Sequence, residues 1–216
     1  MLHNLQEKNS LLSKFIAELR DVNIQRDRMR FRRNMERIGE IFAYEISQTL
    51  AYDIKDVETP MGIAKVNVCT DRVVIANIMR AGIPMHNGFL NYFDDADNAF
   101  VSAYRMHHKD GSFEINLQYV SCPNLKDAVL IVCDPMLATG ASMDIAITNL
   151  LEYGKPKKIH IATAITSAPG LEFIQRNYSH ATFWTGAIDE ELTAKSYIVP
   201  GLGDAGDLSF GPKVQD

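Results

Sequence analysis

The chain has 216 residues and a net charge of −5, with 46% hydrophobic and 23% charged residues. This length is enough for one well-buried core, and no apolar run reaches the roughly 18 residues that a membrane span needs. The negative charge argues against nucleic-acid binding as the main function, although local arginines could still hold an anionic small molecule.

The N-terminal part of the chain is predicted to be helical, over about residues 10–50. Its first stretch, MLHNLQEKNSLLSKF, is too polar for a secretory signal peptide. Apolar residues recur at helical spacing along one face: Phe31, Met35, Ile38, Phe42 and Ile46. Arginines surround this face: Arg26, Arg28, Arg30, Arg32, Arg33 and Arg37. They indicate either an RNA- or phosphate-binding surface or a solvated face or subunit contact. We favour the second, because the segment has only Phe31 to stack on bases.

After Pro60 the pattern changes to short apolar runs closed by turn residues, which is typical of β-strands. The predicted strands cover residues 72–79, 100–105, 128–133, 158–166 and 181–188. Stretches with a helical period lie between several of them, such as 141–154. Strands that alternate with helices predict an α/β fold, and continuous apolar strands predict a mostly parallel sheet covered on both faces. Ligands in such folds bind beyond the carboxyl ends of the strands.

The stretch VLIVCDPMLATGAS, residues 129–142, combines a strand, a turn and a helix start. We predict that the strand ends at Asp134, that 136–140 forms a tight loop, and that a helix begins at Ala141. The first amides of a helix lack internal acceptors and lie at the positive end of its dipole. This arrangement predicts an anion site beside an acidic side chain.

A sugar phosphate fits this predicted site. The phosphate would accept bonds from the loop amides and from the hydroxyls of Thr139 and Ser142. Asp134 suits sugar hydroxyls, because a carboxylate repels phosphate. The alternative is a plain strand–turn–helix connection in which Ser142 caps the helix.

The motif VCDPMLATGAS resembles the phosphoribosyl pyrophosphate (PRPP) motif of type I phosphoribosyltransferases, and its DPMLATG form resembles that of the uracil phosphoribosyltransferases. IMRAGIPM (78–85) resembles the pyrophosphate loop of this family, and YIVPGLGDAGD (197–207) resembles its uracil-binding segment. Purine-specific relatives carry an acid where this chain has Ala138. The resemblance covers about residues 21–213.

The resemblance implies one phosphoribosyltransferase domain, 1–216, with a small base-binding hood. Its parts would be the helical segment at about 10–50, a PRPP-binding core at about 60–190 and a uracil-binding segment at about 190–213. The implied reaction joins uracil and PRPP to give uridine 5′-monophosphate (UMP) and pyrophosphate, as in pyrimidine salvage. The alternative is a non-catalytic PRPP- or nucleotide-sensing or RNA-binding regulator on the same fold.

The resemblance also implies the site residues. PRPP would contact Arg80, Arg105, Asp134, Pro135, Met136, Leu137, Ala138, Thr139, Gly140, Ala141, Ser142 and Asp204. Uracil would contact Tyr197, Ile198, Gly203, Asp204 and Ala205. The implied catalytic residues are Arg80, Arg105 and Asp204. Physically, the planar guanidinium of Arg80 can hold two pyrophosphate oxygens; the alternative is a surface ion pair.

The glycine-rich segment 197–207 suits recognition of a base by main-chain groups, which complement the acceptor–donor–acceptor edge of uracil. A rigid site of this kind rejects cytosine, whose amine would leave a buried group unpaired. Another pyrimidine stays open as the substrate, but orotate would need a cation where this segment offers acids.

Two stretches depart from the family pattern. The loop at 106–113 lacks the expected Glu-Glu-Thr and carries His107, His108 and Lys109, which we interpret as solvated residues rather than metal ligands. Leu208 stands where relatives have Lys or Arg.

No protein metal cage is visible in the sequence, so we expect Mg²⁺ to enter with PRPP. The three cysteines, Cys69, Cys122 and Cys133, fit reduced thiols in a cytoplasmic protein. The resemblance implies a homo-oligomer, a dimer or larger, and a possible GTP effector. We expect neither nucleic acid nor membrane as a partner.

Overall fold

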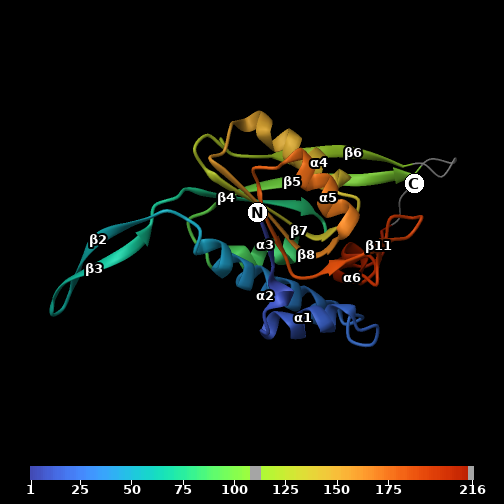
Figure 1. The fold of residues 1–216 in the computed structure, drawn as a ribbon, viewed down its shortest axis with the longest axis horizontal. Coiled ribbons are helices and arrows are strands. Elements are labelled where there is room, and N and C mark those ends of the chain that lie inside the picture. Colours follow the sequence, from blue (N-terminus) through green and yellow to red (C-terminus); the bar gives the residue numbers. More distant parts are fainter. Residues whose placement is uncertain (108–112, 214–216) are drawn as a thin grey trace.

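The computed structural model describes residues 1–107 and 113–213 (Figure 1). Its core is an 8-stranded sheet in the order β1-β9-β8-β7-β4-β5-β6, with β10 also paired to β8. All pairs are parallel except β5–β6. The strands are β1 (Leu2–Asn4), β4 (Val73–Met79), β5 (Asp97–His107), β6 (Phe113–Ser121), β7 (Val129–Leu137), β8 (Lys158–Ser167), β9 (Thr182–Thr185) and β10 (Ile188–Asp189). The predicted α/β class with a mostly parallel sheet is confirmed.

Helices cover both faces of this sheet. Neighbouring residues of a strand point to opposite faces, so Val74 and Ile75 belong to different core clusters. Ile75 packs in one core cluster with α1 (Leu11–Arg20), α2 (Arg28–Ser47) and α3 (Ile83–Leu90). Val74 packs in a second cluster with α4 (Ala141–Leu150) and α5 (Ala168–Asn177). The remaining elements are 3-10 helices η1 (Leu5–Glu7) and η2 (Leu151–Tyr153), strands β2 (Tyr52–Thr59), β3 (Gly62–Cys69), β11 (Glu191–Leu192) and β12 (Ile198–Val199), and α6 (Ala205–Phe210).

The predicted apolar face of α2 is buried within its own subunit, where Phe31, Met35, Ile38, Phe42 and Ile46 are at most 1% exposed. This face is therefore not a subunit contact. Most of the surrounding arginines have internal contacts: Arg30 with Glu18, Arg33 with Glu36, Arg32 with the carbonyl of Ser209, Arg37 with Asn34 and the Phe15 ring, and Arg28 with Gly211.

A β-hairpin formed by β2 and β3 projects away from the body of the molecule (Figure 1). Its strands pair in continuous register from Tyr52↔Cys69 to Thr59↔Gly62. The prediction missed β2, because we expected helix to about residue 50 and strands only after Pro60. Pro60 instead lies in the turn, where the Thr59 hydroxyl donates to the carbonyl of Gly62 at 2.8 Å.

The predicted strand at 181–188 is two strands, β9 and β10, which both pair with β8. Gly186 lies between them, and its amide donates to the carbonyl of Thr163 at 3.0 Å. A Cβ at Gly186 would lie 2.6 Å from the Ala164 carbonyl oxygen. The close approach of the backbone to β8 explains the break. Within the described residues, none of the helices has the length and apolar character needed to cross a bilayer.

A cluster of three rings packs β1 against the neighbouring strands β9 and β8, with Trp184 and His160 buried and His3 half-buried. The His3 ring stacks on Trp184 with the ring centroids 4.0 Å apart, and the Trp184 indole donates to Nδ1 of His160 at 3.0 Å. Burial is the main cause that lowers the pKa of His160 to about 4 and the pKa of His3 below its usual value. The imidazole of His160 is therefore neutral in the folded protein near pH 7.

We expect the free energy of unfolding to fall as the pH is lowered from 6.5 towards about 4, the unfolded and folded pKa values of His160. In that window the unfolded chain binds more protons than the folded chain, at a cost of at most about 1.4 kcal/mol per pH unit for one group. Urea denaturation at a series of pH values measures the slope. His160→Gln, which keeps an acceptor for Trp184, should flatten it, whereas His180→Gln at an exposed histidine should not. Equal slopes in all three proteins would contradict the assignment.

Candidate active site

The predicted motifs meet at one edge of the sheet. Strands β4, β7 and β8 are neighbours and parallel, so their carboxyl ends lie at the same edge. The loop after β4 carries Arg80, and the loop after β7 carries the phosphate motif. The C-terminal segment 197–211 reaches this edge through contacts with Arg80.

Strand β7 is longer than predicted. We expected a loop from Met136, but Met136 and Leu137 still pair with Ile165 and Thr166 of β8. Pro135 lacks an amide donor, which a strand tolerates where it needs hydrogen bonds on one side only. That condition holds here, because the pairing of β7 with β4 ends at Cys133. The connection before α4 is therefore short and comprises 138–140.

This short connection, which we call the phosphate loop (138–140), rests on the start of α5. The Ser167 hydroxyl donates to the carbonyl of Ala138 at 2.5 Å and accepts from the amide of Gly170 at 3.0 Å. A Cβ at Gly170 would lie 2.1 Å from the same carbonyl oxygen, so only glycine permits the contact. Gly140 has φ +84°, and a Cβ there would lie 2.7 Å from the Phe173 ring. The loop conformation is thus fixed by packing as well as by sequence.

The N-terminus of α4 follows the phosphate loop directly. Its N-cap residue is Gly140, and among the described side chains none caps the helix. The Thr139 hydroxyl accepts only a long bond, 3.4 Å, from the amide of Ala141. The alternative interpretation, in which Ser142 is the N-cap, is therefore wrong. The positive end of the α4 dipole adjoins the loop, as an anion site requires.

Arg80 lies between β4 and α3 and points to the C-terminal segment. Its guanidinium forms an ion pair with Asp207 at 3.2 Å and donates to the carbonyl of Gly211 at 3.4 Å. Both side chains are about 40% exposed, at 39% and 40%, and an ion pair this exposed contributes little stability. The surface ion pair that we considered for Arg80 is present, but it holds the guanidinium only weakly.

Asp204 lies beside Arg80. It is the N-cap residue of α6 and accepts from the amide of Asp207 at 2.9 Å. A Cβ at Gly206 would lie 3.2 Å from Asp204 Oδ1 and 3.7 Å from Arg80 Nη2, so both groups flank Gly206. The structure thus brings together two of the predicted catalytic residues.

The third predicted catalytic residue, Arg105, lies on β5 with its backbone paired to Ile115. Its side chain and that of His107 lie outside the described part of the chain, as do His108 and Lys109 entirely. The prediction for Arg105 therefore stays a prediction.

The predicted uracil segment is partly buried and partly exposed. Ile198 and Ala205 are each 4% exposed and belong to the core, whereas Tyr197 is 47% exposed. Gly203 is exposed, with φ +96°. Leu208 packs against the core, and its Cδ1 lies 4.0 Å from the position of a Cβ at Gly203. Leu208 therefore makes an apolar contact at the position where the resemblance led us to expect Lys or Arg.

Sequence reasoning missed the residues that hold this segment. Asp189 and Arg20 bond to the backbone of Gly201, and Asp207 bonds to Arg80. Asp207 belongs to the motif GDAGD, and the repeated Gly-Asp in this motif is the sequence signal that could have identified it. Nothing in the local sequence linked Arg20 to residue 201.

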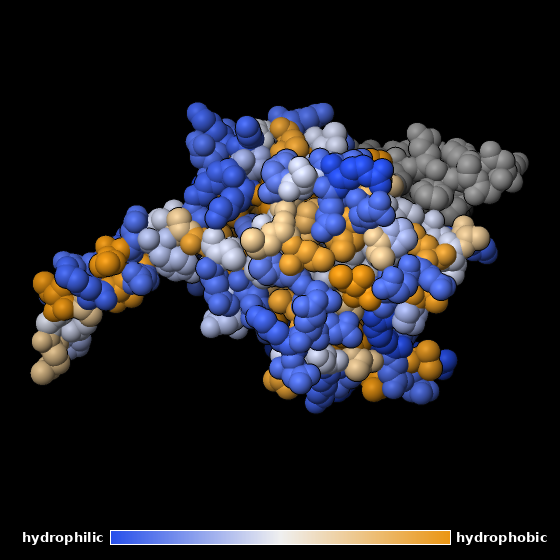
Figure 2. Space-filling view, in the orientation of Figure 1, coloured by the Kyte–Doolittle hydropathy of each residue, from blue (hydrophilic) through white to orange (hydrophobic). Residues whose placement is uncertain are grey.

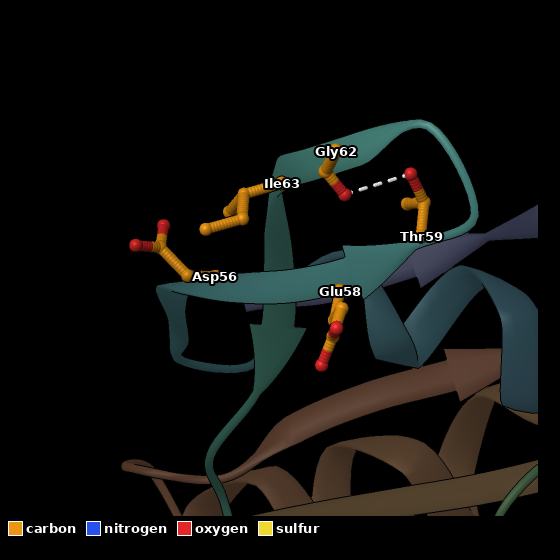
Figure 3. Close-up of a pocket in the computed structure, with 5 residues that line it drawn as sticks. All are labelled: Asp56, Glu58, Thr59, Gly62 and Ile63. Atoms are coloured by element: carbon orange, nitrogen blue, oxygen red, sulfur yellow. Dashed lines mark hydrogen bonds between the residues drawn. The ribbon is translucent and has the colours of Figure 1, made fainter.

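A shallow hollow lies away from these motifs, at the end of the β2–β3 hairpin (Figure 3). It is lined by Asp56, Glu58, Thr59, Gly62 and Ile63. Two strands cannot enclose a ligand, and the lining includes no residue of the phosphate or uracil motifs. We therefore do not assign the chemistry to this hollow.

The three cysteines are free thiols. Burial raises the pKa of Cys122 to about 11 and also raises the pKa of Cys69. The pKa of Cys133 is raised by burial and then by the neighbouring Asp134. All three are therefore protonated near pH 7 and are weak nucleophiles.

Comparison with known proteins gives one consistent result. The family model described as uracil phosphoribosyltransferase matches residues 6–212. A curated uracil phosphoribosyltransferase from Porphyromonas gingivalis is 51% identical over 212 residues, or 98% of each chain. One from Thermococcus gammatolerans is 35% identical over 97% of this chain and 93% of its own. The solved structure of the AQ2163 protein from Aquifex aeolicus is 28% identical, covers 100% of both chains and has a TM-score of 0.88.

We expect Gly140→Ala to lower the free energy of unfolding by about 1–3 kcal/mol and to weaken PRPP binding, because the new methyl group combines a strained φ with a clash. Urea denaturation and calorimetric titration with PRPP measure the two effects. Gly62→Ala is the matched control, since Gly62 also has a positive φ, +144°, but nothing within 4 Å. If both variants lose equal stability and bind PRPP like the wild type, packing against α5 does not shape the loop.

Proposed function

Because this chain belongs to the uracil phosphoribosyltransferase family, we propose that it transfers the phosphoribosyl group of PRPP to uracil at the edge formed by β4, β7 and β8. The products are UMP and pyrophosphate, so the reaction returns free uracil to the nucleotide pool. The strongest support is one juxtaposition. The phosphate loop and the N-terminus of α4 follow β7, while Arg80 and Asp204 meet at Gly206 beside the neighbouring strand.

Each half of PRPP has a proposed binding place. The 5′-phosphate binds the amides of 138–142, with the hydroxyls of Thr139 and Ser142. Asp134 takes the ribose hydroxyls, and Arg80 and Arg105 take the pyrophosphate. Pro135, Met136 and Leu137 contribute through their backbone, because Leu137 is 2% exposed and its side chain is in the core. Gly140 and Ala141 allow the close approach.

The chemistry is mainly one of positioning. Substitution at the ribose carbon passes through a cationic state with little bonding to either group, so correct placement and charge stabilisation lower the barrier. Arg80 stabilises the leaving pyrophosphate, and its weak pair with Asp207 can be exchanged for a stronger, multiply charged ligand. Asp204 contacts both ligands.

Mg²⁺ is the proposed cofactor. It is a hard cation that favours oxygen ligands and often binds through substrate phosphates and one or two carboxylates. Within residues 1–107 and 113–213 no cluster of three or more His, Cys, Asp or Glu side chains is found. We propose that the oxygens of PRPP hold the ion, whose charge would offset that of the pyrophosphate.

Uracil is the proposed base, recognised by main-chain groups of Ile198, Gly203, Asp204 and Ala205, with Tyr197 at the rim. Gly203 and Asp204 are exposed beside buried neighbours, so their backbone can face a ligand while Leu202 and Ala205 anchor the segment. Leu208 serves as a further apolar anchor in place of the usual charge.

The alternative function, an RNA-binding or nucleotide-sensing regulator, relies on the arginines of α2. Arg30, Arg32 and Arg33 already bond to Glu18, Ser209 and Glu36. These contacts leave less unpaired charge for a polyanion, so the enzyme remains the better proposal.

A homo-oligomer is proposed on the strength of the β2–β3 hairpin. Figure 2 shows apolar side chains along this projecting arm. Ile54, Met61 and Ile63 of the hairpin are 67%, 97% and 72% exposed. An isolated two-stranded hairpin is only marginally stable in water, so a second copy of the chain covering it would stabilise it. GTP stays a proposed effector without an assigned residue. The free thiols support a cytoplasmic location.

We expect purified protein to form UMP from labelled uracil, PRPP and Mg²⁺, and to form no nucleotide from cytosine, orotate or hypoxanthine. Chromatography of the labelled products measures this. Asp134→Asn should keep the fold and weaken PRPP use by about tenfold or more, because a charged acceptor is lost. Asp144→Asn is the control, because it alters an acid on α4 that accepts a hydrogen bond from Tyr178. No product from any base, despite PRPP binding, would favour the sensor.

We expect the wild-type protein to be a dimer or larger, and Ile54→Lys combined with Ile63→Lys to dissociate it. These two side chains lie on the same face of the hairpin, as its register requires. Light scattering after size exclusion gives the mass. Leu11→Lys is the control, because Leu11 is an apolar residue of similar exposure, 68%, on the body of the molecule. A monomeric wild type, or equal effects of both changes, would contradict the role of the hairpin.

A further inference from the structure

The amide and the carbonyl of Gly201 both bond to one ion pair, Arg20–Asp189, whose carboxylate is buried. Arg20 binds Asp189 through two hydrogen bonds of 2.8 Å, and its Nη1 also donates to the carbonyl of Gly201 at 3.0 Å. Asp189 Oδ2 accepts from the amide of Gly201 at 2.9 Å. Asp189 is 6% exposed and Arg20 22%. Both main-chain polar groups of Gly201 are therefore hydrogen-bonded to members of this ion pair.

Gly201 is the point about which the base-binding segment turns. It has φ +56°, and a Cβ there would lie 2.2 Å from the carbonyl oxygen of Ile198. The turn thus packs against Ile198, a proposed uracil contact that precedes it in the chain. It then leads through buried Leu202 to Gly203, a proposed uracil contact that follows it. Any shift of Gly201 moves both sets of main-chain groups.

The ion pair also links this turn to the rest of the site. Asp189 pairs in register with Ser167 of β8, and the Ser167 hydroxyl holds the carbonyl of Ala138 in the phosphate loop. Arg20 is the last residue of α1. The end of β8 with β10 therefore forms a shared support, with Ser167 holding the phosphate side and Asp189 holding the base side.

We propose that Arg20 and Asp189 are positioning residues for uracil, which fix Gly201 and so set the main-chain groups that recognise the base. This inference rests on the proposed function. Arginine suits the role because its planar fork bonds both carboxylate oxygens and the carbonyl at once, whereas a lysine ammonium cannot reproduce that geometry. Neither side chain needs to touch uracil, and PRPP binds mainly to other elements.

The test is steady-state kinetics of Arg20→Lys, with uracil and PRPP varied separately. Lysine keeps the charge beside Asp189, so the buried carboxylate stays paired and the chain should fold. We expect KM for uracil to rise about tenfold, with KM for PRPP and the thermal midpoint close to those of the wild type. Arg20→Ala should raise KM for uracil further, so that lysine gives a partial rescue.

Arg30→Lys is the matched control. Arg30 also binds a carboxylate through two hydrogen bonds, to Glu18 at 2.7 and 3.0 Å, and the side-chain hydrogen bonds found for it in the described residues go to Glu18 rather than to residues 197–205. It should leave both KM values unchanged. Conversely, Ser167→Ala should raise KM for PRPP more than KM for uracil.

Three results would overturn the inference: an unchanged KM for uracil in Arg20→Lys, a parallel rise of both KM values, or the same change in Arg30→Lys. The wild-type reaction in the same assay distinguishes failure of the positioning role from failure of the proposed function. Wild-type UMP formation with an unaffected Arg20→Lys rejects the positioning role alone. Absence of wild-type UMP rejects the proposed function, and the positioning role falls with it.

Discussion

The site depends on the point at which β4 and β7 separate. The two strands pair from Val73↔Val129 to Asn77↔Cys133, and β7 then continues with β8 alone. The chain leaves β4 through α3 on one face of the sheet and leaves β7 through α4 on the other. This is a topological switch point, where open parallel sheets bind ligands. Asp134 is the first residue of β7 beyond it, and Arg80 directly follows the end of β4.

The sequence predicted most of this framework because its evidence was local. Continuous apolar runs indicated the strands, and the helix start at Ala141 was correct. The end of β7 was placed too early, because Pro135 reads as a strand breaker when the pairing on each side is unknown. The Gly186 break was hidden in an apolar run, because it depends on contact with Ala164 of a different strand.

The contacts that complete the site could not be predicted in this way. Arg20 was one of many arginines in a helical segment, and its bond to Gly201 spans most of the chain. The partners of Arg80 lie in α6 and beyond it. The β2–β3 hairpin was not predicted for another reason. It has apolar residues on both of its faces, so the alternation of apolar and polar residues did not mark a single buried side.

Three arginines from the first 80 residues, Arg20, Arg32 and Arg80, hold the C-terminal segment at Gly201, Ser209 and Gly211. Contacts so distant in sequence require closure of very long loops, which makes them late events in folding. During synthesis the phosphate loop, β7 and β8 emerge before residue 197 exists. The C-terminal segment, which we propose binds the base, can dock only on a nearly finished sheet, so we expect selectivity for the base to be the last property that each new molecule acquires.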